Sequence, residues 1–209
     1  YPSACHTRFE HCLGVCELAS RIFDTVFHKD HFSGELADRL GVEPDPNCGP
    51  LAQGRSELRL AALLHDVGHL PFSHAAEHFL LPRGQNHETM TGQLLLQGGL
   101  RSLLSDINVN PERVVKLAVG PNSASKFAQI CEDQELARRL LSFSPLEAVL
   151  SEIITGEFGA DRMDYLLRDS HHLGVSYGKF DHLRLVDCLR ILSHPETDAP
   201  TLGVKLGGL

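Results

Sequence analysis

The fold is decided by one stretch, Leu60-Ala-Ala-Leu-Leu-His65-Asp66-Val-Gly68-His69-Leu-Pro-Phe-Ser-His74-Ala-Ala-Glu77. The residues leading into it predict a buried helix, because Leu58, Ala61, Ala62 and His65 recur at the i, i+3, i+4, i+7 spacing of one helix face. His65 is therefore expected on the side that faces the core. Gly68 is expected to end this helix.

The second half of the stretch predicts another helix. Pro71 suits the first turn of a helix. His74, Glu77 and His78 then share one face at the i, i+3, i+4 spacing. Imidazole and carboxylate groups are thus concentrated around the junction of two helices.

The adjacent His65 and Asp66 predict a divalent-metal site. Imidazole is a borderline ligand and carboxylate a hard one, a combination that suits Mn, Fe, Ni, Zn or Mg ions. Burying an aspartate costs several kcal/mol unless its charge is neutralised, and a cation neutralises it. The alternative is a structural His–Asp pair at a helix end. It leaves the histidines that follow and Glu77 unexplained, so we rank the metal site above it.

Composition describes a globular protein. The 209 residues are 42% hydrophobic and 22% charged, and 19 Lys and Arg against 27 Asp and Glu give a net charge of −8 at pH 7. This acidic balance is a poor match for a nucleic-acid backbone. We find neither a signal peptide nor the ~20-residue apolar run of a membrane span, and expect an intracellular protein. Because the sequence starts at Tyr1 rather than Met, we expect a fragment of a longer protein.

The six cysteines form no CxxC pair. We expect small, buried thiols in a reducing cytosol. A zinc site built from Cys5, His6 and Cys12 is an alternative, although its spacing matches no recognised zinc motif.

The remaining chain is predicted to be mostly helical. N-cap residues, prolines at first turns and glycine stops indicate helices over residues 8–27, 34–40, 86–96, 110–120, 134–141 and 144–156. The rest of residues 29–54 is rich in Pro, Gly and Asp and is predicted as loop. Few strand signals precede residue 183. We expect an all-α fold, one domain over residues 1–209, with at most a small β element near the C-terminus.

The first helix carries a histidine on its apolar stripe. His11, Val15, Leu18 and Ile22 follow one face, so His11 is expected to point inward. A single histidine at such a position is more often a core residue than a metal ligand, and on this helix alone the two interpretations are close. Arg8, one turn earlier, points the same way and is placed either to contact an anion or to be solvated.

His87 follows the expected N-cap Asn86. The positive end of the helix dipole opposes protonation there, which would keep His87 neutral and useful as a hydrogen-bond partner. The alternative is an exposed residue beside the cap.

A second informative stretch is Gly159-Ala-Asp161-Arg-Met-Asp164-Tyr165-Leu-Leu-Arg168-Asp169-Ser-His171-His172-Leu-Gly174. On a helix its polar side chains share one face, with Met163, Leu166 and Leu167 on the other. Most charged stripes are solvated surface. The small residues Gly159 and Ala160, and a tyrosine among the charges, favour the lining of a cavity instead.

Together these motifs resemble the HD-domain phosphohydrolases, and within them the deoxynucleoside triphosphate triphosphohydrolase branch. The resemblance spans residues 4–181 and rests on Arg8-Phe9-Glu10-His11, His65-Asp66-Val67-Gly68-His69, Pro71-Phe72-Ser73-His74 and Asp161-Arg162-Met163-Asp164-Tyr165, in the family's order. It implies a helical fold and one divalent metal ion. The implied ligands are His11, His65, Asp66 and Asp161.

The resemblance also implies roles around the metal. His74, paired with Glu77 and near His87, would be the catalytic acid or base. The implied substrate contacts are Arg8 and Arg162 to phosphate, Tyr165 and Asp169 to the sugar, and His69. The substrate would be a deoxynucleoside triphosphate, split into deoxynucleoside and triphosphate, and the protein a homo-oligomer. We expect further family segments that contact substrate to lie outside residues 1–209.

Two other functions stay open. The chain could be another HD phosphohydrolase, acting on nucleoside monophosphates, cyclic nucleotides or alarmone, or a non-catalytic nucleotide-binding regulatory module. The Pro-Phe-Ser-His element with Glu77 and the Asp161–Asp169 stretch favour a deoxynucleoside triphosphate. The intact ligand set disfavours the non-catalytic module.

Overall fold

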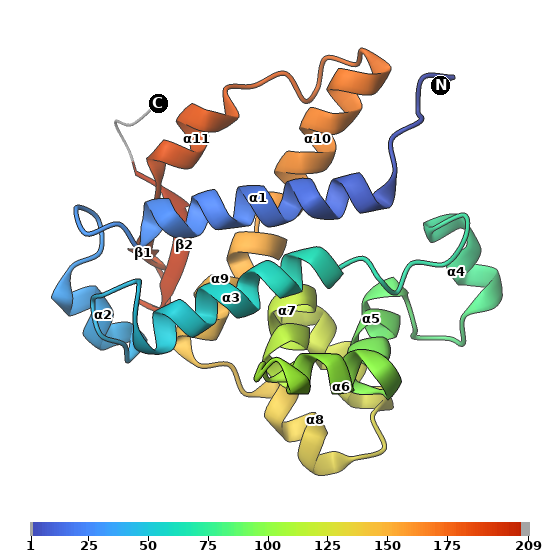
Figure 1. The fold of residues 1–209 in the computed structure, drawn as a ribbon, viewed down its shortest axis with the longest axis horizontal. Coiled ribbons are helices and arrows are strands. Elements are labelled where there is room, and N and C mark those ends of the chain that lie inside the picture. Colours follow the sequence, from blue (N-terminus) through green and yellow to red (C-terminus); the bar gives the residue numbers. More distant parts are fainter. Residues whose placement is uncertain (1, 206–209) are drawn as a thin grey trace.

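The computed structural model describes residues 2–205 as a helical assembly with one small β-hairpin (Figure 1). The helices are α1 (Arg8–Val26), α2 (Gly34–Leu40), α3 (Gly49–Leu64), α4 (His74–Leu80), α5 (His87–Leu96), α6 (Gly98–Asp106), α7 (Pro111–Ile130), α8 (Gln134–Leu141), α9 (Pro145–Thr155), α10 (Ala160–Leu173) and α11 (His182–Cys188). The hairpin pairs β1 (Leu189–Ser193) with β2 (Pro200–Val204), antiparallel. The predicted all-α fold with a small β element near the C-terminus is confirmed.

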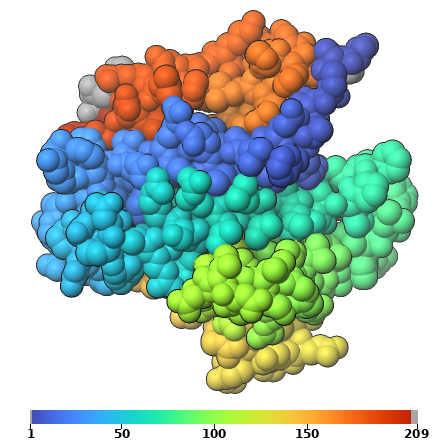
Figure 2. Space-filling model, in the orientation of Figure 1, coloured from blue at the N-terminus to red at the C-terminus, as the bar shows by residue number. Residues whose placement is uncertain are grey.

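The core lies between α1, α3, α7 and α9. Fully buried side chains from each of them meet there, among them Phe23, Leu58, Leu117 and Ile153. In Figure 1, α1 and α3 run side by side in opposite directions. Figure 2 shows α10 and α11 covering one side of α1, while α3 and then α6 to α8 follow on the other. The start of α1, the end of α3 and the start of α10 are therefore brought together.

Local sequence explains where α1 begins and which face it buries. The Thr7 hydroxyl accepts from the Glu10 backbone nitrogen, and the Glu10 carboxylate accepts from the Thr7 nitrogen, which forms a capping box. His11 and Val15 are buried, as the stripe predicted. The capped first turn fixes the positions of Arg8 and His11.

α1 and α10 approach each other closely at Gly14. A Cβ at this position would lie 1.8 Å from Oδ1 of Asp164, so no other residue type fits without a shift. Arg168 links the same two helices, since it donates to the Glu10 carbonyl at 2.9 Å and to both oxygens of Asp164. This contact places Asp164 against His11.

Thr91 holds the end of α3 against α5. Its hydroxyl donates to the carbonyl oxygen of His65 at 2.9 Å and accepts from the Gly68 nitrogen at 3.0 Å. A helix end leaves such backbone groups without partners inside the helix, and here a buried side chain supplies them. His65 and Asp66 are thereby held beside α5.

Gly68→Ala is expected to destabilise this junction. A Cβ would lie 2.2 Å from the His87 carbonyl oxygen and 2.3 Å from the Thr91 nitrogen. Both atoms belong to the backbone of α5, so the free energy of unfolding should fall by about 2–3 kcal/mol, as for other overpacked sites. Urea unfolding measures the difference. Gly34→Ala, where a Cβ meets nothing within 4 Å, is the control, and equal stability of the two variants would contradict the packing argument.

Two expectations around α3 and α4 are wrong. Helix α3 begins at Gly49, inside the stretch predicted as loop, because Leu51 is fully buried and Gly54 packs closely on Leu150. Pro71 does not open α4, which begins at His74. The intervening turn places Ser73 at a φ of 52°, which ends any helical path from Pro71.

The region after residue 96 is more helical than predicted. Helix α6 was not expected, and α7 extends to Ile130 instead of ending at Gly120. Gly120 does interrupt the helix, with a φ of 69° and a ψ of 173°. Pro121 then starts a second helical segment, which buries Ala124 and Phe127. Burial of these side chains stabilises a helix that the polar composition of the segment did not predict.

Within residues 2–205, we find no helix both long and apolar enough to span a membrane. The intracellular location stays a prediction.

Candidate metal centre

Three helix ends bring two histidines and an aspartate together. His11 comes from the start of α1, His65 follows the end of α3 and Asp161 lies in the first turn of α10. Oδ1 of Asp161 is 3.1 Å from Nε2 of His11 and 3.6 Å from Nε2 of His65. One ligand atom from each residue lies within 4.8 Å of the others. This cluster can hold a metal ion.

Both histidines are oriented by hydrogen bonds on the far side of the ring. Nδ1 of His65 bonds to the Ala62 carbonyl oxygen at 2.8 Å, and Nδ1 of His11 lies 2.7 Å from Oδ2 of Asp164. Such partners are typical of metal-binding imidazoles, because they direct the other nitrogen at the ion. Nε2 of His65 is buried and, within residues 2–205, has no well-aligned hydrogen-bond partner, although Oδ1 of Asp161 lies 3.6 Å away. A divalent cation therefore fits this donor set.

Asp66 lies beside the cluster rather than within it. Its Oδ2 accepts from the Arg8 guanidinium, while Oδ1 lies 3.4 Å from Nε2 of His65. Oδ2 is 3.7 Å from Nε2 of His11. Asp66 is thus within reach of the same ion, and its role as a ligand stays a prediction.

Without a bound cation, the neighbouring aspartates raise the pKa of both histidines, so both rings stay protonated. Burial lowers the pKa of His11, but hydrogen bonds to Asp161 and Asp164 outweigh burial and raise the pKa to about 9. Burial of His65 is outweighed in the same way, by Asp161, Cys12 and Asp66, and its pKa rises to about 10. Burial raises the pKa of Asp161, yet both histidines hold it well below its usual range.

Metal binding is therefore expected to release about two protons per ion near neutral pH. A ligating imidazole must be deprotonated, and below pH 9 both His11 and His65 carry a proton in the metal-free chain. Affinity should rise with pH, by up to about 100-fold per unit, and level off above pH 10. Calorimetry in two buffers of different ionisation enthalpy measures the protons. Buffer-independent heats would contradict this account.

A second cluster of histidines lies next to Asp66, around Glu77 on α4. Oε1 of Glu77 is 2.9 Å from Nδ1 of His87 and 3.2 Å from Nδ1 of His74. The rings of His69 and His87 stack at 3.9 Å, and Nε2 of His69 is 3.5 Å from Oδ1 of Asp66. Burial and His69 lower the pKa of His87, which keeps it neutral. The predicted neutral His87 agrees with this lowered pKa, which burial causes first, not the helix dipole.

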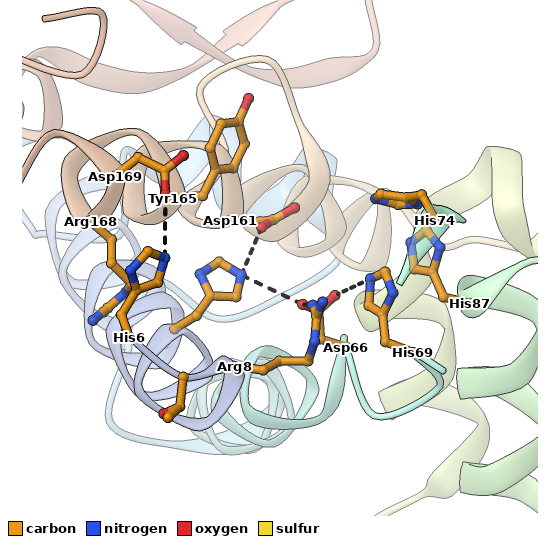
Figure 3. A pocket seen from close by; sticks show the side chains of 12 residues that line it. His6, Arg8, Asp66, His69, His74, His87, Asp161, Tyr165, Arg168 and Asp169 are labelled. Atoms are coloured by element: carbon orange, nitrogen blue, oxygen red, sulfur yellow. Dashed lines mark hydrogen bonds and ion pairs between the residues drawn. The ribbon is translucent and has the colours of Figure 1, made fainter. Parts of the chain in front are cut away.

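Both clusters open into one cleft of about 410 Å³, shown in Figure 3. Its lining consists of His6, Thr7, Arg8, His11, Asp66, His69, His74, His87, Asp161, Tyr165, Arg168 and Asp169. The polar face of α10 thus lines a cavity and is not simply solvated surface. Glu77 and His65 lie behind this lining as partners of the residues in it.

Arg162 is exposed and does not line the cleft. Asp161, Tyr165 and Asp169 share a helix face at i, i+4 and i+8, and the residue after Asp161 points about 100° away from it. A phosphate contact from Arg162 stays a prediction.

Three cleft residues were assigned no site role from sequence, His6, Thr7 and Arg168, although Arg168 stands on the polar face that was predicted to line a cavity. His6 precedes α1, and its Nε2 lies 3.4 Å from Oδ1 of Asp169. No periodicity marks a residue before a helix, so this contact had no sequence signal. Arg168 pairs with Asp164 at i+4, a spacing that was visible and could have identified the pair.

No cluster within residues 2–205 that could hold a metal ion includes a cysteine. The prediction of buried thiols is wrong for Cys5 and Cys48, which are exposed.

The fold and the site together define a helical domain whose cleft contains a His–Asp cluster able to hold a metal ion. A family model described as HD domain matches residues 8–167, and the chain belongs to this family. The resemblance to the HD-domain phosphohydrolases is thereby confirmed.

Individual relatives agree with this family. An uncharacterized protein of Mycoplasma pneumoniae is 30% identical, over 91% of this chain and 38% of that protein. Human deoxynucleoside triphosphate triphosphohydrolase SAMHD1 is 29% identical, over 91% of this chain and 29% of that protein. The crystal structure of a hypothetical protein from Aquifex aeolicus superposes with a TM-score of 0.65 at 34% identity, over 99% of this chain and 43% of that chain. The chain thus spans less than half the length of each.

Proposed function

We propose that this chain hydrolyses deoxynucleoside triphosphates to deoxynucleoside and triphosphate, with a divalent metal ion as cofactor. One observation carries the proposal: a metal-competent cluster and a histidine–glutamate cluster line the same cleft, with Asp66 between them. The name of the human relative, a deoxynucleoside triphosphate triphosphohydrolase, supports this substrate class. When bound, the cation would supply positive charge to phosphate oxygens.

Arg8 is placed to bind phosphate at the edge of the cleft. Its guanidinium donates to Asp66 and, at 3.1 Å, to the Ser73 hydroxyl, while its side chain stays 44% exposed. These two contacts use only some of the five guanidinium N–H donors and hold the group in position. The remaining donors can bind phosphate oxygens beside the metal-competent cluster.

His74 is placed to transfer the proton that hydrolysis requires. Its ring is exposed at the cleft, with Nδ1 3.2 Å from Oε1 of Glu77. Burial raises the pKa of Glu77, but the hydrogen bond from His87 outweighs it and lowers the pKa, so Glu77 stays ionised. The carboxylate orients the His74 ring through the contact to Nδ1. Nε2 can then donate a proton to the leaving 5′-oxygen of the deoxynucleoside.

Tyr165 and Asp169 are expected to contact the sugar. The Tyr165 side chain is exposed in the cleft, so Tyr165→Phe should raise KM or lower kcat with little change in stability. Asp169 accepts from the Tyr177 hydroxyl at 2.8 Å, and Asp169→Asn should weaken deoxynucleotide binding by about 1.5–3 kcal/mol. Nucleotide titrations measure both effects. Changes within about 0.5 kcal/mol, with unchanged kinetics, would mean that neither residue contacts the sugar.

Product identification by chromatography tests the proposed reaction. A panel of deoxynucleoside and nucleoside triphosphates is incubated with the metal-loaded protein, with Asp161→Ala as the control for contaminating activity. Deoxynucleoside and triphosphate are the expected products. Release of inorganic phosphate, or turnover only of monophosphates or cyclic nucleotides, would point to another HD phosphohydrolase. Homo-oligomerisation stays a prediction.

A further inference from the structure

A strained turn precedes α4 and carries Ser73. Phe72 and Ser73 adopt φ angles of 68° and 52°, a region that residues other than glycine rarely occupy. The Phe72 side chain is 88% exposed, so its packing does not hold the turn in this conformation. Strain of this kind persists only where other contacts fix the backbone, and it is common at binding and catalytic sites. The contacts of Ser73 therefore indicate the role of the turn.

The Ser73 hydroxyl lies between two residues of the cleft. It accepts from the Arg8 guanidinium at 3.1 Å and is 3.0 Å from Nδ1 of His69. Arg8 and His69 also meet at Asp66, whose Oδ2 accepts from the guanidinium and whose Oδ1 lies 3.5 Å from Nε2 of His69. Figure 3 shows the Arg8 side chain and the His69 ring converging on Asp66. The four side chains thus form a closed ring of polar contacts.

Donors and acceptors around this ring run in one consistent direction. A guanidinium only donates and an ionised carboxylate only accepts, whereas a hydroxyl does both. The Ser73 oxygen therefore accepts from Arg8, and its own hydrogen is left for Nδ1 of His69. The other ring nitrogen, Nε2, then carries the proton and faces Asp66. A neutral His69 is in this way held as the tautomer with hydrogen on Nε2.

The His69 ring is also fixed through its face. It stacks on His87 with ring centroids 3.9 Å apart and planes inclined by 9°, and its side chain is only 5% exposed. The stack fixes the plane of the ring, and the Ser73 hydroxyl fixes its rotation within that plane. At 3.5 Å the contact of Nε2 with Asp66 is long, so this donor stays available to an anion in the cleft.

We propose that Ser73 is a positioning residue, which presents the Arg8 guanidinium and the Nε2–H group of His69 to one phosphate group of the substrate. The inference rests on the proposed function and defines its phosphate subsite: a cation and a neutral donor, both oriented by one hydroxyl. Donors that are already oriented bind an anion more tightly, because less conformational freedom is lost on binding. The strained turn is what brings the hydroxyl within reach of both residues.

Calorimetry with inorganic triphosphate tests this role without turnover. The 209-residue chain is used in excess magnesium, so that the ligand does not strip metal from the protein. Ser73→Ala should weaken triphosphate binding by about 10-fold, because a hydrogen bond that orients a charged group is lost. Ser56→Ala is the matched control and should bind as wild type does, since it removes an exposed hydroxyl on α3 that donates to the Ala52 carbonyl oxygen.

Ser73→Gly separates the hydroxyl from the backbone. Glycine adopts a positive φ without steric cost, so this variant releases the strain and should melt at the wild-type temperature or above. It also lacks the hydroxyl and should bind triphosphate as weakly as Ser73→Ala. Recovery of wild-type affinity in Ser73→Gly would show that only the backbone matters and would overturn the proposal.

Nitrogen NMR of the histidine rings gives a signature that a merely structural role would not change. The His69 signal, assigned with His69→Ala, should show the proton on Nε2 in wild type and a mixture of tautomers in Ser73→Ala. An unchanged His69 signal, or triphosphate affinity within about 2-fold of wild type in both Ser73 variants, would overturn the role.

Steady-state kinetics with a deoxynucleoside triphosphate separates Ser73 from its neighbour His74. In Ser73→Ala, KM should rise about 10-fold while kcat changes by less than about 3-fold, because phosphate binding is lost and proton transfer is not. A loss confined to kcat would mean that the substitution acts through His74 and would overturn the role. Triphosphate binding that depends on Ser73, in a wild type that turns over no deoxynucleotide, would support the role and refute the proposed function.

Discussion

The double substitution His65→Ala, Asp66→Ala is expected to abolish manganese binding at the centre between α1, α3 and α10. Manganese accepts mixed imidazole and carboxylate ligands, so about one equivalent should bind wild type there. Loss of His65 removes a buried Nε2 that lies 3.6 Å from Oδ1 of Asp161 in this centre. Asp161→Ala alone should have nearly the same effect, because its Oδ1 faces both His11 and His65.

Electron paramagnetic resonance of free manganese measures this loss. Asp38→Ala, which removes an exposed carboxylate on α2, is the control and should bind as wild type does. Catalysis should disappear together with the metal. Stoichiometric manganese in the His65, Asp66 double variant would refute the assignment of this centre.

His74→Ala separates proton transfer from binding. This variant should keep the manganese and bind nucleotide, because His74 lies outside the metal-competent cluster of His11, His65 and Asp161. Its turnover should be at least ~100-fold slower, because a positioned proton-transfer group typically accelerates a reaction by at least that factor. Glu77→Gln should also slow turnover, since it removes the carboxylate that lies 3.2 Å from Nδ1 of His74. Single-turnover kinetics at saturating nucleotide measures both effects.

His78→Ala is the matched control for this experiment. His78 lies on α4 four residues from His74 and is exposed, so its removal should leave kcat unchanged. Near-wild-type kcat in His74→Ala would place the acid or base elsewhere. His69 and His87, which face the same Glu77 oxygen, would then be the next candidates.

Helix ends that depend on neighbouring residues could be predicted from sequence. Ser144 and Glu147 form the capping box that opens α9, and Asn86 caps α5, as their spacing indicated. Both signals act within one helical turn. The starts of α3 and of the second segment of α7 could not be predicted in this way. Leu51 and Phe127 are held in helices because distant parts of the core bury them, and this packing outweighs local preference.

The candidate site, too, has features that the sequence predicts and features that it does not. By itself, the sequence determined which residues are chemically able to bind a metal, since His65, Asp66 and Asp161 stand in recognisable motifs. Only the tertiary structure decided which atoms meet. Asp164 orients His11 from 153 positions away, and this contact exists because Gly14 lets α1 and α10 approach closely. The convergence of three imidazoles on Glu77 likewise depends on how α5 packs against the end of α3. Spacing over a few residues indicates which side chains share a helix face. Contacts between distant segments arise only when the core is packed.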